Sequence, residues 1–203
     1  MRIAIVVYDG FDELDALGPY EVLCNARFGG ADAQVLLVGL SPAPRVTGSH
    51  GLAVEPQGTL DDGPFDLVVV PGGGWNDRAV AGAHAEASRG ALPARLRALH
   101  AAGAAIASVC TGGMLVAAAG LSRGRPSTTH RSALEDLRAE GADVVDARVV
   151  DEGDLLSCGG VTAGIDLALW IVEREWGRPL ADGVAAEMEY ERRGPIWTRA
   201  AGS

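Results

Sequence analysis

A cysteine stands where a strand is expected to turn directly into a helix. The apolar run 104–109 is followed by Cys110 and then by Thr111-Gly112-Gly113, which opens a helix predicted over 111–119. The N-terminal end of a helix favours negative charge, and this position lowers a cysteine pKa towards the thiolate. The turn resembles a nucleophile elbow. Cys110 is therefore a candidate nucleophile, and the alternative is a small buried apolar residue.

Three glycines follow Pro71 at the end of another apolar run, 66–70. Backbone N–H groups of consecutive glycines, such as Gly72 and Gly73, can face an anion because no side chain shields them. Beside a nucleophile, such groups form an oxyanion hole. The glycines lack the spacing of a dinucleotide-binding loop, so the alternative is a plain tight turn.

The third candidate is an acid in the helix predicted over 12–27. Leucines mark the apolar face of this segment, and Asp15 lies beside that face. A partly desolvated carboxyl has a raised pKa and can hold or exchange a proton. The alternative for Asp15 is a position on a solvated helix face. Asp12 and Glu13 fit the roles of N-cap and first-turn acid.

The elements that position these residues are predicted from the apolar pattern. Runs that are apolar at nearly every position indicate strands buried on both faces of a parallel sheet. These runs are 2–7, 34–40, 66–70, 104–109 and 142–146. Helical patterns are found at 12–27, 86–102, 111–119, 131–140, 162–176 and 179–190. Short β excursions are expected at 45–48, 52–55, 147–151 and 154–157.

Alternating strands and helices indicate βαβ units with a sheet covered on both sides. A length of 203 residues suits one domain, and neither a linker nor an internal repeat divides the chain. We therefore expect a single three-layer α/β domain over residues 1–203. In such sheets ligands bind at the carboxyl ends of the strands, where Cys110 and the glycine run are found.

Composition excludes several classes of function. Acidic residues outnumber basic ones 27 to 17, and the net charge of -10 would repel a phosphate backbone, so we expect no nucleic-acid partner. All 17 basic residues are Arg. Without Lys, Schiff-base chemistry and a Walker-type phosphate site are excluded. The sequence has no apolar run long enough to span a bilayer, so we expect no membrane partner.

The cysteines indicate the compartment. Cys24, Cys110 and Cys158 are an odd number without CxxC spacing, which argues against a disulfide framework and against a structural zinc site. Residues 1–10 lack the features of a secretory signal. We therefore expect a cytoplasmic protein without a bound metal.

Taken together and in this order, the motifs resemble the ThiJ/PfpI superfamily of flavodoxin-like proteins. The shared features are the acid three residues before Gly18-Pro19, the PGG turn, SVCTGG around Cys110, TTH at 128–130 and GGVTAGIDLAL at 159–169. The resemblance implies a flavodoxin-like three-layer sandwich with a mostly parallel central sheet. It also implies a homodimer.

Two positions indicate the branch of this superfamily. Protease-like members have His where this chain has Thr111, and deglycase-like members have Glu where it has Asp15. The pairing is most similar to the isonitrile hydratases, which add water to R–N≡C and give an N-substituted formamide. This resemblance implies Cys110 as nucleophile, Asp15 as proton carrier, and the N–H groups of Gly73 and Thr111 near the nucleophile. It implies no cofactor.

Attack by the Cys110 thiolate on an isonitrile carbon gives a thioimidate once Asp15 supplies a proton. Water deprotonated by the same carboxylate then attacks, and the formamide leaves. His130 lies near the nucleophile in members of the superfamily, with simple packing at a strand end as the alternative. Trp75 and Arg131 are further candidates for the pocket wall.

Two other functions fit the same residues. One is a glyoxalase or deglycase, which would use Cys110 and Asp15 on an α-oxoaldehyde. The other is a non-catalytic sensor domain whose thiol oxidises reversibly. A turnover assay separates the three, because the products are a formamide, lactate or an oxidised cysteine.

Overall fold

The apolar runs of the sequence assemble into one central sheet. The structure is a computed structural model that describes residues 1–199, so residues 200–203 of the predicted domain lie outside it. Across the sheet the strands are β12 (Ile196–Thr198), β10 (Val149–Asp151), β11 (Leu155–Cys158), β7 (Ala105–Ser108), β6 (Leu67–Val70), β1 (Arg2–Val6), β2 (Gln34–Gly39) and β5 (Gly58–Thr59). Every neighbouring pair is parallel except β10 and β11. The predicted mostly parallel sheet is confirmed.

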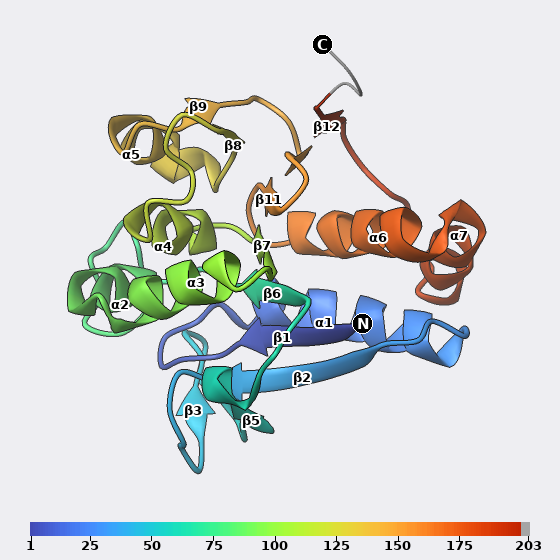
Figure 1. Ribbon diagram of the computed structural model, residues 1–203, viewed down its shortest axis with the longest axis horizontal. Coiled ribbons are helices and arrows are strands. Elements are labelled where there is room, and N and C mark those ends of the chain that lie inside the picture. The colour runs from blue at the N-terminus through green and yellow to red at the C-terminus, as the bar shows by residue number, and fades with distance from the viewer. Residues whose placement is uncertain (200–203) are drawn as a thin grey trace.

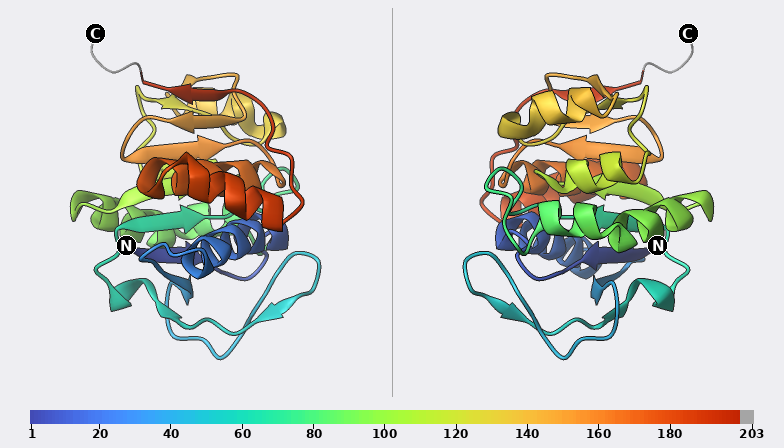
Figure 2. Two further views of the ribbon diagram at one scale, coloured as in Figure 1. Left: turned by 90° about the vertical axis from the view of Figure 1, so that its right-hand side faces the viewer. Right: turned by 90° about the vertical axis from the view of Figure 1, so that its left-hand side faces the viewer.

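Helices cover both faces of the sheet and complete the predicted three layers (Figure 1). One layer consists of α1 (Glu13–Phe28), α6 (Ala163–Trp176) and α7 (Arg178–Glu187). The other layer consists of α2 (Ala83–Arg89), α3 (Ala91–Ala101), α4 (Gly112–Ala118) and α5 (Leu134–Ala139). Figure 2 shows the two layers from opposite sides. Strands between two helical layers must be apolar on both faces, which explains the continuous apolar runs.

Short elements lie outside the central sheet. Two 3₁₀ helices are η1 (Leu60–Asp62) and η2 (Arg131–Ala133). Two small sheets are formed by β3 (Val46–Thr47) with β4 (Ala53–Val54) and by β8 (Pro126–Ser127) with β9 (Asp143–Val144). The predicted excursions at 45–48 and 52–55 are therefore confirmed as one hairpin.

The single helix predicted over 86–102 is wrong, because two helices occupy this segment. Gly90 adopts a left-handed φ of +77° between α2 and α3. This conformation ends a helix, and glycine adopts it without strain. The leucines that supported the prediction all lie on the buried face of α3. The apolar spacing thus predicted the buried face of α3 correctly, but it did not predict the end of α2 at Gly90.

The strand predicted at 142–146 lies outside the central sheet. Only two of its residues pair, and they pair with β8. The place beside β7 belongs to β11, and β10 and β11 form an antiparallel pair within the sheet rather than a short excursion. Every residue of β11 is buried, whereas Asp143 is exposed. The middle of a covered sheet requires a segment that can be buried completely, which β11 is and 142–146 is not.

The carboxyl ends of four neighbouring strands meet at one edge of the sheet. β1, β6, β7 and β11 run parallel, so the loops that follow them lie side by side. The loop after β7 begins with Cys110 and the loop after β6 carries the glycine run. The helix α1 follows β1 and brings Asp15 to the same edge. The fold thus gathers the candidate residues.

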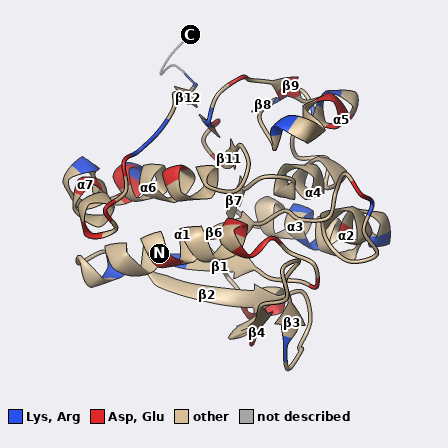
Figure 3. Ribbon diagram, turned by 180° about the vertical axis from the view of Figure 1, so that it is seen from behind, with Lys and Arg blue, Asp and Glu red and all other residues tan. Residues whose placement is uncertain are grey.

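Charged residues lie mainly on the helices and loops (Figure 3). The strands β2 and β7 contain none, as their buried positions require. Within residues 1–199, no helix is both long enough and apolar enough to cross a membrane.

Candidate active site

The predicted elbow at the end of β7 is present. Cys110 has a left-handed φ of +56°, a conformation in which a non-glycine residue is strained. Its N–H donates to the carbonyl oxygen of Gly159 at 3.0 Å, and its own carbonyl oxygen accepts from Thr129 Oγ1 at 2.7 Å. Two neighbouring loops therefore hold the backbone of Cys110 in place.

The two glycine-rich stretches form opposite sides of one tight junction. A Cβ atom at Gly72 would lie 2.5 Å from the backbone nitrogen of Thr111. A Cβ atom at Gly112 would lie 2.1 Å from the carbonyl oxygen of Val70. No side chain fits at such distances, so glycine is required where the loop after β6 contacts the start of α4. This contact brings the PGG turn next to Cys110.

Asp15 is a fully buried carboxyl at the start of α1. Asp12 caps this helix as predicted, with its carboxylate accepting from the N–H of Leu14 at 3.2 Å. One oxygen of Asp15, Oδ2, accepts from the N–H of Gly72 at 2.9 Å. The other oxygen, Oδ1, has no partner of hydrogen-bonding geometry among residues 1–199. Burial, together with the charge of Asp12, raises the pKa of Asp15 to about 7.

The sequence-based expectation of a lowered thiol pKa at Cys110 is wrong in this structure. Only 7% of Cys110 is exposed, and burial together with the nearby charge of Asp15 raises the pKa of its thiol to about 12. The helix that follows is only seven residues long, so its field is small beside these two effects. The thiol of Cys110 is therefore neutral at physiological pH, with Asp15 beside it.

The N–H groups of the PGG turn do not form the expected oxyanion hole. The N–H of Gly72 binds Asp15, and the N–H of Gly73 donates to Thr111 Oγ1 at 2.9 Å. Both glycines therefore hold other site residues in position. The hydroxyl oxygen of Thr111 accepts this bond, which ties the start of α4 to the loop after β6.

The N–H groups at the sulfur are those of Thr111, as expected, and of Val161, which takes the place expected for Gly73. Both favour the charged form of the thiol, and the N–H of Val161 also favours the charged form of Asp15. Val161 has a left-handed φ of +46°, an unusual conformation for a β-branched residue. Sequence analysis did not single it out. The only signal was its place in GGVTAG, directly after a strand of the sheet.

A cleft of about 400 Å³ opens beside these groups. It is lined by Thr128, Thr129, His130, Arg131, Leu134, Asp146, Ala147, Arg148, Gly159, Gly160 and Val161. Cys110 and Asp15 are buried and do not line this cleft, but Val161 does, and its N–H faces both the thiol and the carboxylate. His130 and Arg131 lie in this wall, as the sequence suggested. Trp75 lines a different cavity and donates through Nε1 to Asp136 at 2.7 Å.

The two remaining cysteines lie differently from Cys110. Cys24 is half-buried on α1, away from the cleft lining. Cys158 is completely buried in β11, and burial raises the pKa of its thiol. Neither of them combines a left-handed backbone with a nearby acid, so Cys110 alone of the three has the setting of a nucleophile.

Asp12, Glu13 and His50 are close enough to suggest a metal site, because their ligand atoms lie within 4.8 Å of one another. Glu13, however, accepts from the backbone N–H of His50 at 2.7 Å and contacts its Nδ1 at 2.5 Å. Leu52 N–H also donates to this carboxylate at 3.3 Å. The hydrogen bonds explain the cluster as an anchor for the β3–β4 hairpin, a role that the sequence did not reveal for Glu13.

These groups place a thiol and an acid–base residue in one buried site. A pKa of about 7 allows Asp15 to accept a proton in one step and return it in the next at neutral pH. The N–H groups of Thr111 and Val161 stabilise negative charge on the sulfur as it reacts. The arrangement suits addition of a thiol, and then of water, to a small electrophile.

Known proteins share this fold and much of this sequence. Residues 1–174 match the DJ-1/PfpI family. An isonitrile hydratase of Pseudomonas putida is 36% identical over 97% of this chain and 81% of its own length. A deglycase of Pyrococcus abyssi is 28% identical over 77% of this chain and 89% of its own length. A solved structure of a ThiJ/PfpI family protein from Pseudomonas syringae has 31% identity and a TM-score of 0.83, covering 100% of this chain and 78% of that one.

Proposed function

Since this chain belongs to the DJ-1/PfpI family, we propose that it is a cysteine-dependent enzyme that adds water to an isonitrile and gives an N-substituted formamide. One observation carries the proposal: a buried aspartate that has no cation partner among residues 1–199, and whose pKa is about 7, lies beside the thiol of Cys110. The 36% identity to an isonitrile hydratase supports this choice among reactions that need a thiol and an acid.

The first half-reaction forms a carbon–sulfur bond. The carboxylate of Asp15 accepts the thiol proton while the sulfur of Cys110 attacks the isonitrile carbon. Asp15 then returns this proton to the same carbon, which gives the thioimidate R–N=CH–S–Cys. Because the thiol is neutral at rest, Asp15 must act as base before it acts as acid.

The second half-reaction consumes water. The carboxylate of Asp15 accepts a proton from water while the water oxygen attacks the thioimidate carbon, and this proton passes to the nitrogen. The carbon–sulfur bond then breaks, the hydroxyl proton returns to the sulfur, and R–NH–CHO leaves. One carboxyl thus serves both half-reactions, and the residues at the site supply every proton transfer.

A turnover assay tests this function. Purified protein should convert simple alkyl and aryl isonitriles to formamides, and in isotopically labelled water the formyl group should gain one labelled oxygen. Mass spectrometry detects both. Cys110→Ala and Asp15→Asn proteins are the controls. If no isonitrile in the panel gives a formamide while methylglyoxal gives lactate, the proposal is rejected.

A glyoxalase or deglycase is the second candidate, because a deglycase is also among the relatives at 28% identity. It would use the same thiol and carboxyl on an α-oxoaldehyde. Asp15→Glu separates the two candidates. The longer side chain moves the carboxyl by one carbon–carbon bond, and a displacement of this size costs about 100-fold in rate. Loss of isonitrile hydration with a gain of α-oxoaldehyde activity would show that the length of the acid selects the reaction.

A homodimer in a reducing compartment, the cytoplasm, is also part of the proposal. Two exposed leucines, Leu14 and Leu52, flank the anchor formed by Glu13, and exposed apolar residues favour an interface. The three free cysteines are consistent with reducing conditions. Light scattering of the purified protein tests the oligomeric state, and fractionation of its host cells tests the location.

A further inference from the structure

The ring of His130 is held in one orientation by the residue two positions later. Its Nδ1 accepts from the backbone N–H of Ser132 at 3.3 Å and lies 2.6 Å from Ser132 Oγ. A ring nitrogen that accepts an N–H cannot carry a proton itself, so the hydroxyl of Ser132 also donates to Nδ1. The neutral imidazole must then carry its proton on Nε2.

The protonated edge of this ring lies at the cleft. A Cβ atom at Gly160 would be 2.2 Å from Cδ2 of His130 and 3.0 Å from its Nε2. The ring therefore packs directly on the backbone of Gly160, and both residues line the cleft. Gly160 precedes Val161, whose N–H faces the sulfur of Cys110. The Nε2–H donor of His130 thus lies against Gly160, the residue directly before the one whose N–H faces Cys110.

A second residue reaches Ser132 from another part of the chain. Asn76 donates from its side-chain nitrogen to Ser132 Oγ at 2.5 Å. Asn76 lies in the loop after β6, the same loop in which the N–H of Gly72 holds Asp15. With its oxygen accepting from Asn76, Ser132 has its hydroxyl hydrogen available for His130. Asn76, Ser132 and His130 therefore form one hydrogen-bonded chain from the loop of the acid to the wall of the cleft.

We infer that Asn76 and Ser132 are positioning residues that keep His130 as an Nε2–H donor for the nitrogen atom of the bound substrate. The inference rests on the proposed function, because that nitrogen is the thioimidate nitrogen, which has a lone pair, whereas the nitrogen of the isonitrile has none. As water attacks the thioimidate carbon, electron density moves to the nitrogen. A fixed N–H donor stabilises the nitrogen at that stage. His130 gives a hydrogen bond only, and the proton that stays on the product nitrogen comes from the water.

Nuclear magnetic resonance tests the positioning without any substrate. The nitrogen chemical shifts of the His130 ring should show a bare Nδ1 and a protonated Nε2 in the unmodified protein at a pH where the ring is neutral. Ser132→Ala removes the hydroxyl contact at 2.6 Å and keeps only the longer backbone N–H contact at 3.3 Å, so the Nδ1-protonated tautomer should become detectable, and Ser132→Thr should restore the single form. Ser88→Ala, the same change at an exposed serine on α2, should leave the His130 signals unchanged. A protonated Nδ1 in the unmodified protein overturns the inference.

Kinetics test the consequence. Ser132→Ala should lower kcat about tenfold and leave KM nearly unchanged, the order of effect expected for one hydrogen bond. Ser132→Thr should restore kcat. His130→Gln, which keeps an N–H donor near the position of Nε2, should be more active than His130→Ala. Equal kcat values for Ser132→Ala and Ser88→Ala, despite a changed tautomer, overturn the role in the reaction.

The two experiments separate this inference from the proposed function. Absence of any formamide from the unmodified protein rejects isonitrile hydration, and with it the donor role towards the thioimidate nitrogen. The resonance experiment still decides whether Asn76 and Ser132 orient the ring, because it needs no turnover. Asn76→Ala serves as a second variant at a surface position, where the change cannot disturb the core.

Discussion

The buried carboxylates of this protein have opposite electrostatic surroundings: four of them are paired with arginine, and Asp15, within the part of the chain that the structure describes, is not. Four of them, Glu86, Asp151, Glu152 and Asp166, each form an ion pair with an arginine. Asp15 is more deeply buried than any of these and has no ion pair among residues 1–199. Its only hydrogen bond of standard geometry comes from the N–H of Gly72. A buried charge without a partner is costly, so the fold accepts this cost only at the site.

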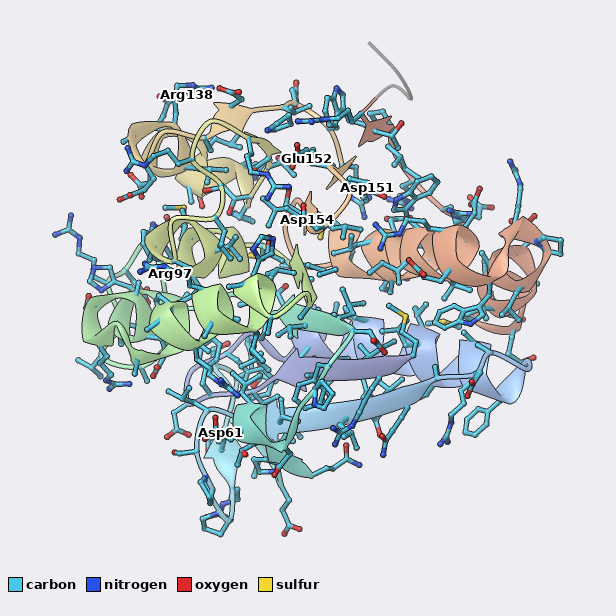
Figure 4. The ribbon with its side chains drawn as sticks, viewed as in Figure 1. Asp61, Arg97, Arg138, Asp151, Glu152 and Asp154 are labelled. Atoms are coloured by element: carbon cyan, nitrogen blue, oxygen red, sulfur yellow. The ribbon has the colours of Figure 1, made fainter. Side chains whose placement is uncertain are left out.

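Two of the paired acids, Glu152 and Asp151, stabilise the edge of the sheet through their contacts. Glu152 lies between Arg125 and Arg199, and Arg199 follows directly after the edge strand β12. Asp151 accepts from Trp170 Nε1 at 2.8 Å and contacts Arg174 at 3.2 Å. Figure 4 shows both acids together with Asp154 close to β11 and α6. At this edge the charges are neutralised, and the carboxylates act only as hydrogen-bond acceptors.

The difference shows how one fold obtains a group that titrates near neutral pH. Arginine partners favour the charged form of a carboxyl, whereas burial without a cation favours the neutral form. Burial and the charge of Asp12 therefore raise the pKa of Asp15 to about 7, with no arginine to oppose them among residues 1–199. This contrast leads to five predictions.

Replacing the nucleophile has the largest expected effect. Cys110→Ala should reduce formamide formation to the uncatalysed background, because the other thiol that senses the charge of Asp15, Cys158, is completely buried in β11. Cys24→Ser is the matched control and should retain full turnover, since Cys24 lies on α1 away from the cleft. Substantial residual turnover in Cys110→Ala would rule out the covalent pathway.

The second-largest effect on turnover is expected from replacing Asp15, the proposed proton carrier. Asp15→Asn should lower kcat roughly 10²–10⁴-fold, the usual contribution of a group that transfers protons in the transition state. The same substitution at a paired acid, Asp151→Asn, should change kcat by no more than about twofold in an initial-rate assay. Similar rates for the two variants would show that the lone acid has no special role.

The free energy of unfolding should depend on pH through Asp15. Its pKa is raised from 3.8 to about 7 in the folded protein, so the folded state binds more protons between these values. Stability should therefore fall as the pH rises from about 4 to about 7, by up to about 4 kcal/mol, and stay level above pH 7. Denaturant unfolding at several pH values measures this slope. Asp15→Asn should lack it, and an unchanged slope in that variant would contradict the raised pKa.

At the paired acids the expected effect is on stability rather than on rate. Asp151→Asn removes the buried ion-pair partner of Arg174 and leaves it, among residues 1–199, only the more exposed Glu175. It also weakens the contact with Trp170. Breaking a partly buried pair in this way should cost about 3 kcal/mol of unfolding free energy. Urea unfolding at neutral pH measures it. If Asp15→Asn lowered the unfolding free energy as much as Asp151→Asn, the contrast between the paired acids and Asp15 would be wrong.

The smallest expected effect concerns the thiol. The pKa of Cys110 lies above that of a free cysteine because of burial and of the charge on Asp15. Asp15→Asn removes the charge and should lower the thiol midpoint by about one unit, with burial keeping it from falling further. Ultraviolet absorbance of the thiolate, measured against Cys110→Ala, reports the midpoint. A midpoint below the free value in the unmodified protein would favour the thiolate as the resting form.

Much of the fold, and the residues that meet at the candidate site, could be predicted from the sequence. Apolar runs, the Cys-Thr-Gly-Gly turn and the acid on the first helix are patterns of consecutive residues, and local geometry follows directly from such patterns. The same reasoning failed at Gly90 and at 142–146. There a single backbone torsion, or competition between two segments for one place in the sheet, decided the outcome.

The electrostatic state of the site was decided only by the tertiary structure. Whether Asp15 has a cation nearby depends on residues that lie far away in the chain, and so does the occupation of the Gly72 and Gly73 N–H groups. Burial and the neighbouring carboxylate reversed the direction of the thiol pKa that the helix position alone had suggested. The sequence by itself determined which residues are able to react. Desolvation and distant partners, which exist only after folding, determined the protonation states in which they do so.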